Sequence, residues 1–124
     1  MAVKDYSQLE TWQKAMDLAE SVYSATKSYP KDELYGLTSQ TRRSAVSVPS
    51  NIAEGQGRGS GRDCVRFLAV ARGSLCELET QLLLAQRLRY IDRTSVGPLW
   101  SQSATVGRLI NGRIRSVAPP SDLS

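Results

Sequence analysis

The segment that most constrains the fold is residues 39–61, with the sequence SQTRRSAVSVPSNIAEGQGRGSG. Its small and polar residues have helical spacing, Pro49 lies near the middle, and glycines at alternate positions end it. Proline removes a backbone hydrogen bond from a helix interior and kinks the helix. Because this helix has few large apolar side chains to bury, it must pack closely against other helices. The segment therefore predicts one helix of a bundle, followed by a glycine-rich turn.

Apolar residues elsewhere in the chain recur at alternating spacings of three and four, which is the pattern of a buried helix face. No segment alternates with period two over a useful length, so no strand is expected. The pattern predicts an all-α fold, an up-down-up-down antiparallel four-helix bundle over residues 1–117, with a disordered tail over 118–124. The expected helices span residues of about 8–28, 35–55, 61–89 and 94–116.

The third of these helices has the clearest pattern. Its apolar and small residues form a seam that favours packing at a shallow angle against neighbouring helices. The seam residues are Cys64, Leu68, Ala71, Leu75, Leu78, Leu82 and Ala85.

Short polar residues precede three of the expected helices. Ser7, with Glu10 three residues later, has the pattern of a capping box. The other expected N-caps are Ser60 and either Asp92 or Thr94.

Composition limits the chemistry that the chain can perform. It contains no histidine, which removes the commonest general base and the commonest metal ligand. The two cysteines, Cys64 and Cys76, lie about 18 Å apart along one helix, too far for a disulfide or a shared zinc ion. We therefore expect no catalytic residue, no metal, no cofactor and no enzymatic activity.

The glycine-rich turn does not match a nucleotide-binding loop. In residues 57–62, GRGSGR, Arg62 stands where the dinucleotide-binding fingerprint needs its third glycine. No predicted strand precedes the turn either, so a plain turn is the better interpretation.

Targeting signals are also not expected. The sequence has no apolar run of about 18 residues, which a membrane-spanning helix would need. Residues 1–20 carry four carboxylates and lack the apolar region of a secretory signal. Two thiols that cannot pair suit a reducing compartment. We expect a cytoplasmic protein with no membrane partner.

The net charge of +4 is unevenly distributed along the chain. Residues 1–57 hold six basic and seven acidic side chains, whereas residues 58–124 hold ten arginines and five acidic side chains. The predicted topology brings five arginines to the end of the bundle that carries the glycine turn. This arginine cluster is the candidate nucleic-acid-binding site, because arginine recognises phosphate well, but a solvated helix face explains the asymmetry equally. Its members are Arg58, Arg62, Arg66, Arg113 and Arg115; a smaller group, Arg87, Arg89 and Arg93, lies at the opposite end.

The antiparallel arrangement also sets the register between the second and third helices. Arg42 and Arg43 come level with Glu77, and Glu54 comes level with Arg62. We expect a buried or half-buried Arg–Glu pair there, whose main role would be to fix register. The expected structural polar network comprises Arg42, Arg43, Asn51, Glu54 and Glu77.

The sequence resembles a bacterial family of four-helix bundle proteins, those related to proteins encoded in 23S rRNA intervening sequences. The resemblance covers nearly the whole chain and is most specific at residues 12–15 (WQKA), 35–40 (YGLTSQ), 42–55 (RRSAVSVPSNIAEG) and 67–80 (FLAVARGSLCELET). It implies a ring-like homopentamer with no known catalytic activity and a largely uncharacterised role. The same fold group includes the accessory variability protein of diversity-generating retroelements, which binds nucleic acid and a reverse transcriptase.

The sequence is compatible with two functions. The first is a non-enzymatic homo-oligomer that binds RNA or DNA through its arginines. The second is an adaptor or scaffold for proteins, in which the arginines pair with acidic residues of neighbouring subunits. Its candidate partners are a reverse transcriptase or another protein.

Overall fold

The computed structural model describes residues 6–120. Within this range the chain forms four α-helices, one short 3-10 helix between the first two, and no strand, so the predicted all-α class is confirmed. The elements are α1 (Glu10–Thr26), η2 (Lys31–Glu33), α2 (Leu37–Gly57), α3 (Arg62–Arg87) and α4 (Arg93–Val117). Of the tail expected over 118–124, residues 121–124 lie outside the described part.

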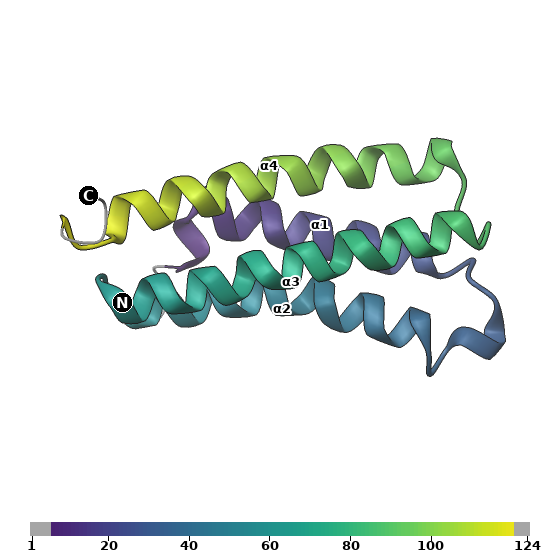
Figure 1. The fold of residues 1–124 in the computed structure, drawn as a ribbon, viewed down its shortest axis with the longest axis horizontal. Coiled ribbons are helices and arrows are strands. Elements are labelled where there is room, and N and C mark those ends of the chain that lie inside the picture. Colours follow the sequence, from purple (N-terminus) through teal and green to yellow (C-terminus); the bar gives the residue numbers. More distant parts are fainter. Residues whose placement is uncertain (1–5, 121–124) are drawn as a thin grey trace.

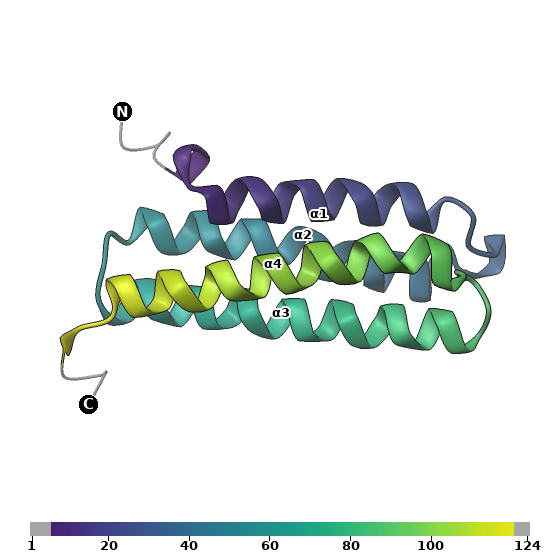
Figure 2. The same cartoon turned by 90° about the horizontal axis from the view of Figure 1, so that it is seen from above.

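Each helix has two neighbours, because α1 contacts α2, α2 contacts α3, α3 contacts α4, and α4 contacts α1. The α2–α3 turn lies at the same end of the molecule as the start of α1 and the end of α4 (Figures 1 and 2). The other two connections lie at the opposite end. This arrangement places the glycine turn beside the last turn of α4.

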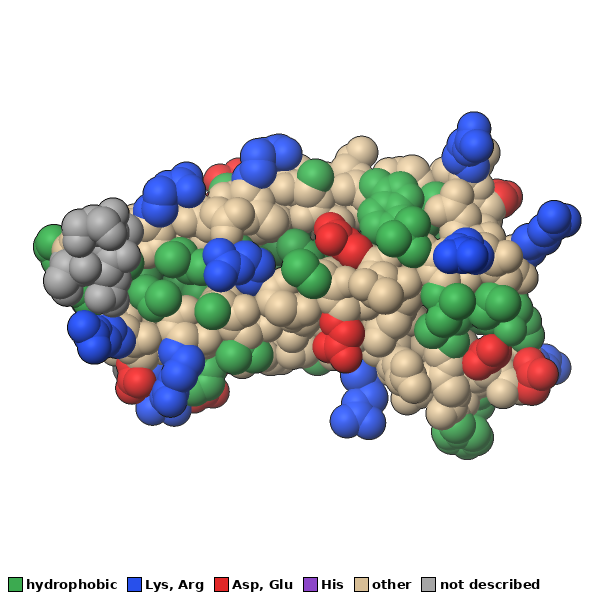
Figure 3. All heavy atoms as spheres, in the orientation of Figure 1, with side chains coloured by type: hydrophobic (Ala, Val, Ile, Leu, Met, Phe, Trp, Pro, Cys, Tyr) green, Lys and Arg blue, Asp and Glu red, His purple; other side chains and the backbone are tan. Residues whose placement is uncertain are grey.

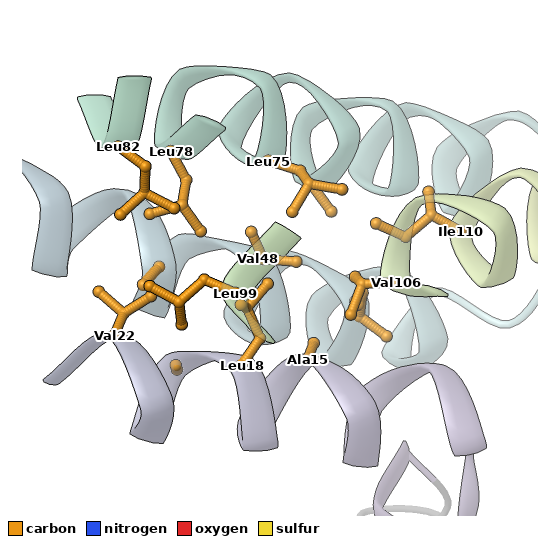
Figure 4. Packing of buried hydrophobic residues seen from close by; sticks show 14 of the residues in the cluster. Ala15, Leu18, Val22, Val48, Leu75, Leu78, Leu82, Leu99, Val106 and Ile110 are labelled. Carbon is orange, nitrogen blue, oxygen red and sulfur yellow. The ribbon is translucent and has the colours of Figure 1, made fainter. Parts of the chain in front are cut away.

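The core runs along the centre of the four helices (Figure 4). Every member of the seam predicted on α3 is buried, from Cys64 to Ala85. Leu78 and Leu82 have no exposed surface, and they face apolar side chains from the other helices. The helical spacing of small and apolar residues thus accounts for the core that closes the bundle.

Helix α2 continues through Pro49 without interruption, and the proline is itself buried. At its C-terminal end α2 packs very closely on α3. A Cβ atom added to the buried Gly55 would lie 3.2 Å from the carbonyl oxygen of Cys64 and 3.3 Å from Cβ of Phe67. Only glycine fits this contact without displacing α3.

The helix starts differ from the expected caps in two of three cases. Asp92 caps α4 as predicted, its carboxylate accepting a 2.8 Å hydrogen bond from the backbone N–H of Ser95. The prediction of Ser7 is wrong, because a 3-10 turn occupies residues 6–8 and Leu9 is the N-cap of α1. The prediction of Ser60 is wrong as well, because α3 begins after Gly61, whose φ of 86° lies in the left-handed region.

A hydrogen-bonded clamp holds the end of the bundle opposite the glycine turn. Glu33 accepts a 3.0 Å bond from the backbone N–H of Leu37, at the start of α2, and a 2.8 Å bond from the hydroxyl of Tyr90, beyond α3. These bonds lower the pKa of the Glu33 carboxyl. The clamp therefore joins two connections that lie far apart in the sequence.

Candidate nucleic-acid interface

The glycine turn and the end of α4 are joined directly. The backbone N–H of Gly61 donates a 2.9 Å hydrogen bond to the carbonyl of Val117, and Arg113 donates a 2.7 Å bond to the side chain of Gln56. Gly59 and Gly61 both have φ near +85°, at 83° and 86°, which glycine adopts without strain. These contacts bring the arginines of the turn and of α4 to one end of the molecule.

Two arginines of the cluster share one aromatic ring. The guanidinium carbons of Arg58 and Arg66 lie 4.9 Å and 5.4 Å from the ring centroid of Phe67. Each also forms a local ion pair of 3.1 Å, Arg58 with Glu54 and Arg66 with Asp63. The ion pairs are exposed to solvent, so they add little stability and leave both guanidinium groups accessible.

The other three arginines have different surroundings. Arg62 is the exposed first residue of α3, and Arg113 is half-buried. Arg113 also lies near the buried Cys64, whose thiol pKa is raised by burial and partly lowered again by the arginine charge. Arg115 is exposed and forms no hydrogen bond or ion pair with residues 6–120.

The cluster has a net positive charge. Glu54 and Asp63 neutralise two of its five guanidinium groups at most. Figure 3 shows Lys and Arg side chains standing out at this end of the molecule, with fewer acidic ones between them. Such a surface can attract phosphates, which is a chemistry of binding and not of catalysis.

The predicted polar network is arranged differently from the expectation. The prediction that Arg42 pairs with a glutamate of α3 is wrong, because its guanidinium packs on α1. It donates hydrogen bonds of 2.8 Å to the Thr26 hydroxyl and 3.3 Å to the Tyr23 carbonyl, and it lies 4.7 Å from the centroid of the Tyr23 ring. Glu54 pairs with Arg58, four residues later on the chain.

The polar contact that joins α2 to α3 is made by serines, which the sequence reading missed. Ser47 and Ser74 share a 2.8 Å hydrogen bond, and the Asn51 amide donates to Ser47. Arg43 and Glu77 line one hollow between the two helices, but no ion pair joins them. The spacing of serines along α2 is the signal that could have identified this contact.

A comparison with protein-family models supports one family. The model described as the 23S rRNA-intervening sequence protein matches residues 7–112. The chain belongs to this family. A comparison with curated proteins finds no match.

The family match covers α1, α2, α3 and most of α4, but it ends before Arg113 and Arg115. The arginine cluster of this family member is therefore built partly from residues beyond the matched region. Residues 6–120 contain no group of three acidic or cysteine side chains placed to hold a metal ion. Within the same residues, no helix is both long and apolar enough to cross a bilayer.

Proposed function

We propose that this member of the 23S rRNA-intervening sequence protein family is a non-catalytic, up-down-up-down four-helix bundle that binds RNA or DNA through its arginine cluster. We also propose that it acts in the cytoplasm as a ring-like homo-oligomer, a pentamer. The topology is supported by the alternating ends at which the three connections lie.

One observation carries the nucleic-acid proposal. The Gly61–Val117 and Arg113–Gln56 hydrogen bonds join two distant parts of the sequence at one end, and all five arginines lie there. Arg115 has no hydrogen-bond or ion-pair partner within residues 6–120, so phosphate can bind it without breaking such a contact with them. A ring would repeat the same positive surface in every subunit and raise the local field.

The test measures the binding of a labelled RNA and of a labelled DNA by fluorescence anisotropy at several salt concentrations. Phosphate contacts release counterions, so the affinity should fall steeply between about 50 and about 200 mM salt. The double variant Arg66→Gln/Arg115→Gln should bind several-fold more weakly and show a shallower dependence on salt.

The matched control is Arg87→Gln/Arg93→Gln, which removes the same charge from the opposite end of the bundle. It should bind almost as tightly as the unmodified protein. Equal losses in the two double variants, or binding that does not respond to salt, would contradict the proposed site.

The alternative function is an adaptor or scaffold for proteins that does not bind nucleic acid. The local ion pairs of Arg58 and Arg66 favour it, because they show these accessible guanidinium groups bound to carboxylates, the groups that a protein partner would offer. In that case Arg58→Ala/Arg62→Ala should break the oligomer. Neither this variant nor the unmodified protein should bind nucleic acid. A reverse transcriptase or another protein is then the candidate partner, which co-purification with the unmodified protein would test.

A further inference from the structure

The surface formed by α2 and α3 carries polar groups that have no partner among residues 6–120. A hollow of about 330 Å³ lies there, lined by Gln40, Arg43, Ser44, Ser47, Glu77 and Gln81. Arg43 and Glu77 are exposed and form no ion pair or hydrogen bond with residues 6–120. The side-chain oxygen of Gln81 is buried and has no hydrogen-bond partner in the described part of the chain, which is costly for a polar atom.

Apolar side chains flank this hollow on the same side of α3. Val70 and Leu84 lie seven residues before and after Glu77, and residues seven apart share one side of a helix. Leu88 lies seven residues after Gln81, and Val70, Leu84 and Leu88 are each 47% exposed. Figure 3 shows apolar side chains gathered between the end of α3 and the start of α2. We call this surface the α2–α3 face.

Gly73 on the same side of α3 also lacks an explanation within the chain. Glycine in a helix interior costs about 0.5–1 kcal/mol relative to alanine. An added Cβ at Gly73 would have nothing within 4 Å, so no neighbour within residues 6–120 requires a glycine there. A residue without a side chain lets a second helix approach α3 closely.

A second unpartnered surface lies on the adjoining side of the molecule, between α1 and α2. It is a groove of about 670 Å³ whose lining includes Trp12, Met16, Tyr23, Val46 and Pro49. Met16, Tyr23 and Val46 are 39%, 43% and 42% exposed. The groove also carries one carboxylate and one ammonium group, from Glu20 and Lys27.

We propose that the α2–α3 face of one copy of this chain docks into the α1–α2 groove of the next copy. The face presents exposed leucines to a concave apolar surface of matching chemistry. Both surfaces carry one cation and one carboxylate, so Arg43 can pair with Glu20 and Glu77 with Lys27 in the neighbouring copy. The occupant is a second copy because the exposed apolar side chains of the face suit the apolar lining of the groove, and the opposite charges of the two surfaces can pair.

The positions of the two surfaces favour a closed ring. A contact between two different surfaces is head-to-tail, and it closes only if the surfaces have a suitable angle between them. Neighbouring faces of a four-helix bundle are roughly 90° apart, and a ring of four or five copies needs about 90° or about 108°. This inference rests on the proposed homo-oligomer and adds which surfaces meet.

Two double variants test the contact, each placing charges at exposed positions that the fold tolerates. Leu84→Glu/Leu88→Glu places two carboxylates on the face, and Met16→Glu/Val46→Glu places two carboxylates in the groove. Each double variant should therefore prevent docking through the altered surface. By light scattering, each should have the mass of a single chain, with the helical circular dichroism of the unmodified protein. An equimolar mixture should have the mass of two chains, because one intact face and one intact groove remain.

The control is Leu83→Glu, at a 52% exposed position on α3 that does not belong to the face. It should keep the oligomeric mass of the unmodified protein. If the unmodified protein is itself a single chain, the proposed ring fails. If it assembles and either double variant still assembles, or the mixture stays at the mass of one chain, head-to-tail docking is overturned while assembly stands.

Discussion

Gly55 shows at the scale of one residue how the sequence sets the distance between two helices. A methyl group at this position would press on the Cys64 carbonyl and on Phe67. Overpacking costs about 1–3 kcal/mol, and the gain in helix propensity from alanine offsets only about 1 kcal/mol of it. Gly55→Ala should therefore lower the free energy of unfolding, measured with urea at a fixed protein concentration.

The matched substitution is Gly112→Ala in α4. An added Cβ there meets only the flexible side chain of Arg115, 3.8 Å away, which is an ordinary contact, so the propensity gain remains. It should raise the free energy of unfolding by about 0.5–1 kcal/mol. The same sign for the two substitutions would mean that Gly55 is not needed for close packing.

Glu33 makes stability depend on pH. The Leu37 N–H and the Tyr90 hydroxyl hold its carboxyl pKa below the ordinary value for glutamate. A lowered folded-state pKa adds stability above the unfolded-state pKa, and this stability is lost as pH falls through the folded-state pKa. Glu33→Gln should lower the free energy of unfolding at neutral pH and flatten its decline in acid, whereas Asp32→Asn should leave that decline unchanged. Parallel pH curves for Glu33→Gln and the unmodified protein would contradict the clamp.

At the scale of elements, the seam of α3 is the part of the fold that the sequence predicts best. Its spacing identifies a buried face without any knowledge of the neighbours, and all seven seam residues are buried. Leu78→Ala should cost about 2–5 kcal/mol of unfolding free energy, because it leaves a cavity in the core. Leu83→Ala, on the exposed side, should change it by less than about 0.5 kcal/mol. Equal effects in urea unfolding would show that the seam is not the core.

The caps and polar contacts were less predictable, because they depend on backbone geometry that a spacing pattern does not contain. Ser60 has the right residue type, but the N-cap of α3 is the left-handed Gly61 that follows it. The antiparallel register of α2 and α3 predicted an ion pair between Arg42 and a glutamate of α3. The long side chain of Arg42 instead contacts Tyr23 on α1. The arginine cluster was easier to predict, since it follows from the chain direction and the helix lengths.

At the scale of the whole molecule, the unpartnered surfaces and the stability of the fold should be linked. A partner that binds only the folded state stabilises it, and the effect grows with concentration, by on the order of 1 kcal/mol for each tenfold increase above Kd. If copies dock through the α2–α3 face, the melting temperature of the unmodified protein and of Leu83→Glu should rise with protein concentration. That of Leu84→Glu/Leu88→Glu should not, because its copies remain separate. A melting temperature of the unmodified protein that is constant across a hundredfold dilution series would show that burial of these surfaces contributes nothing to the fold.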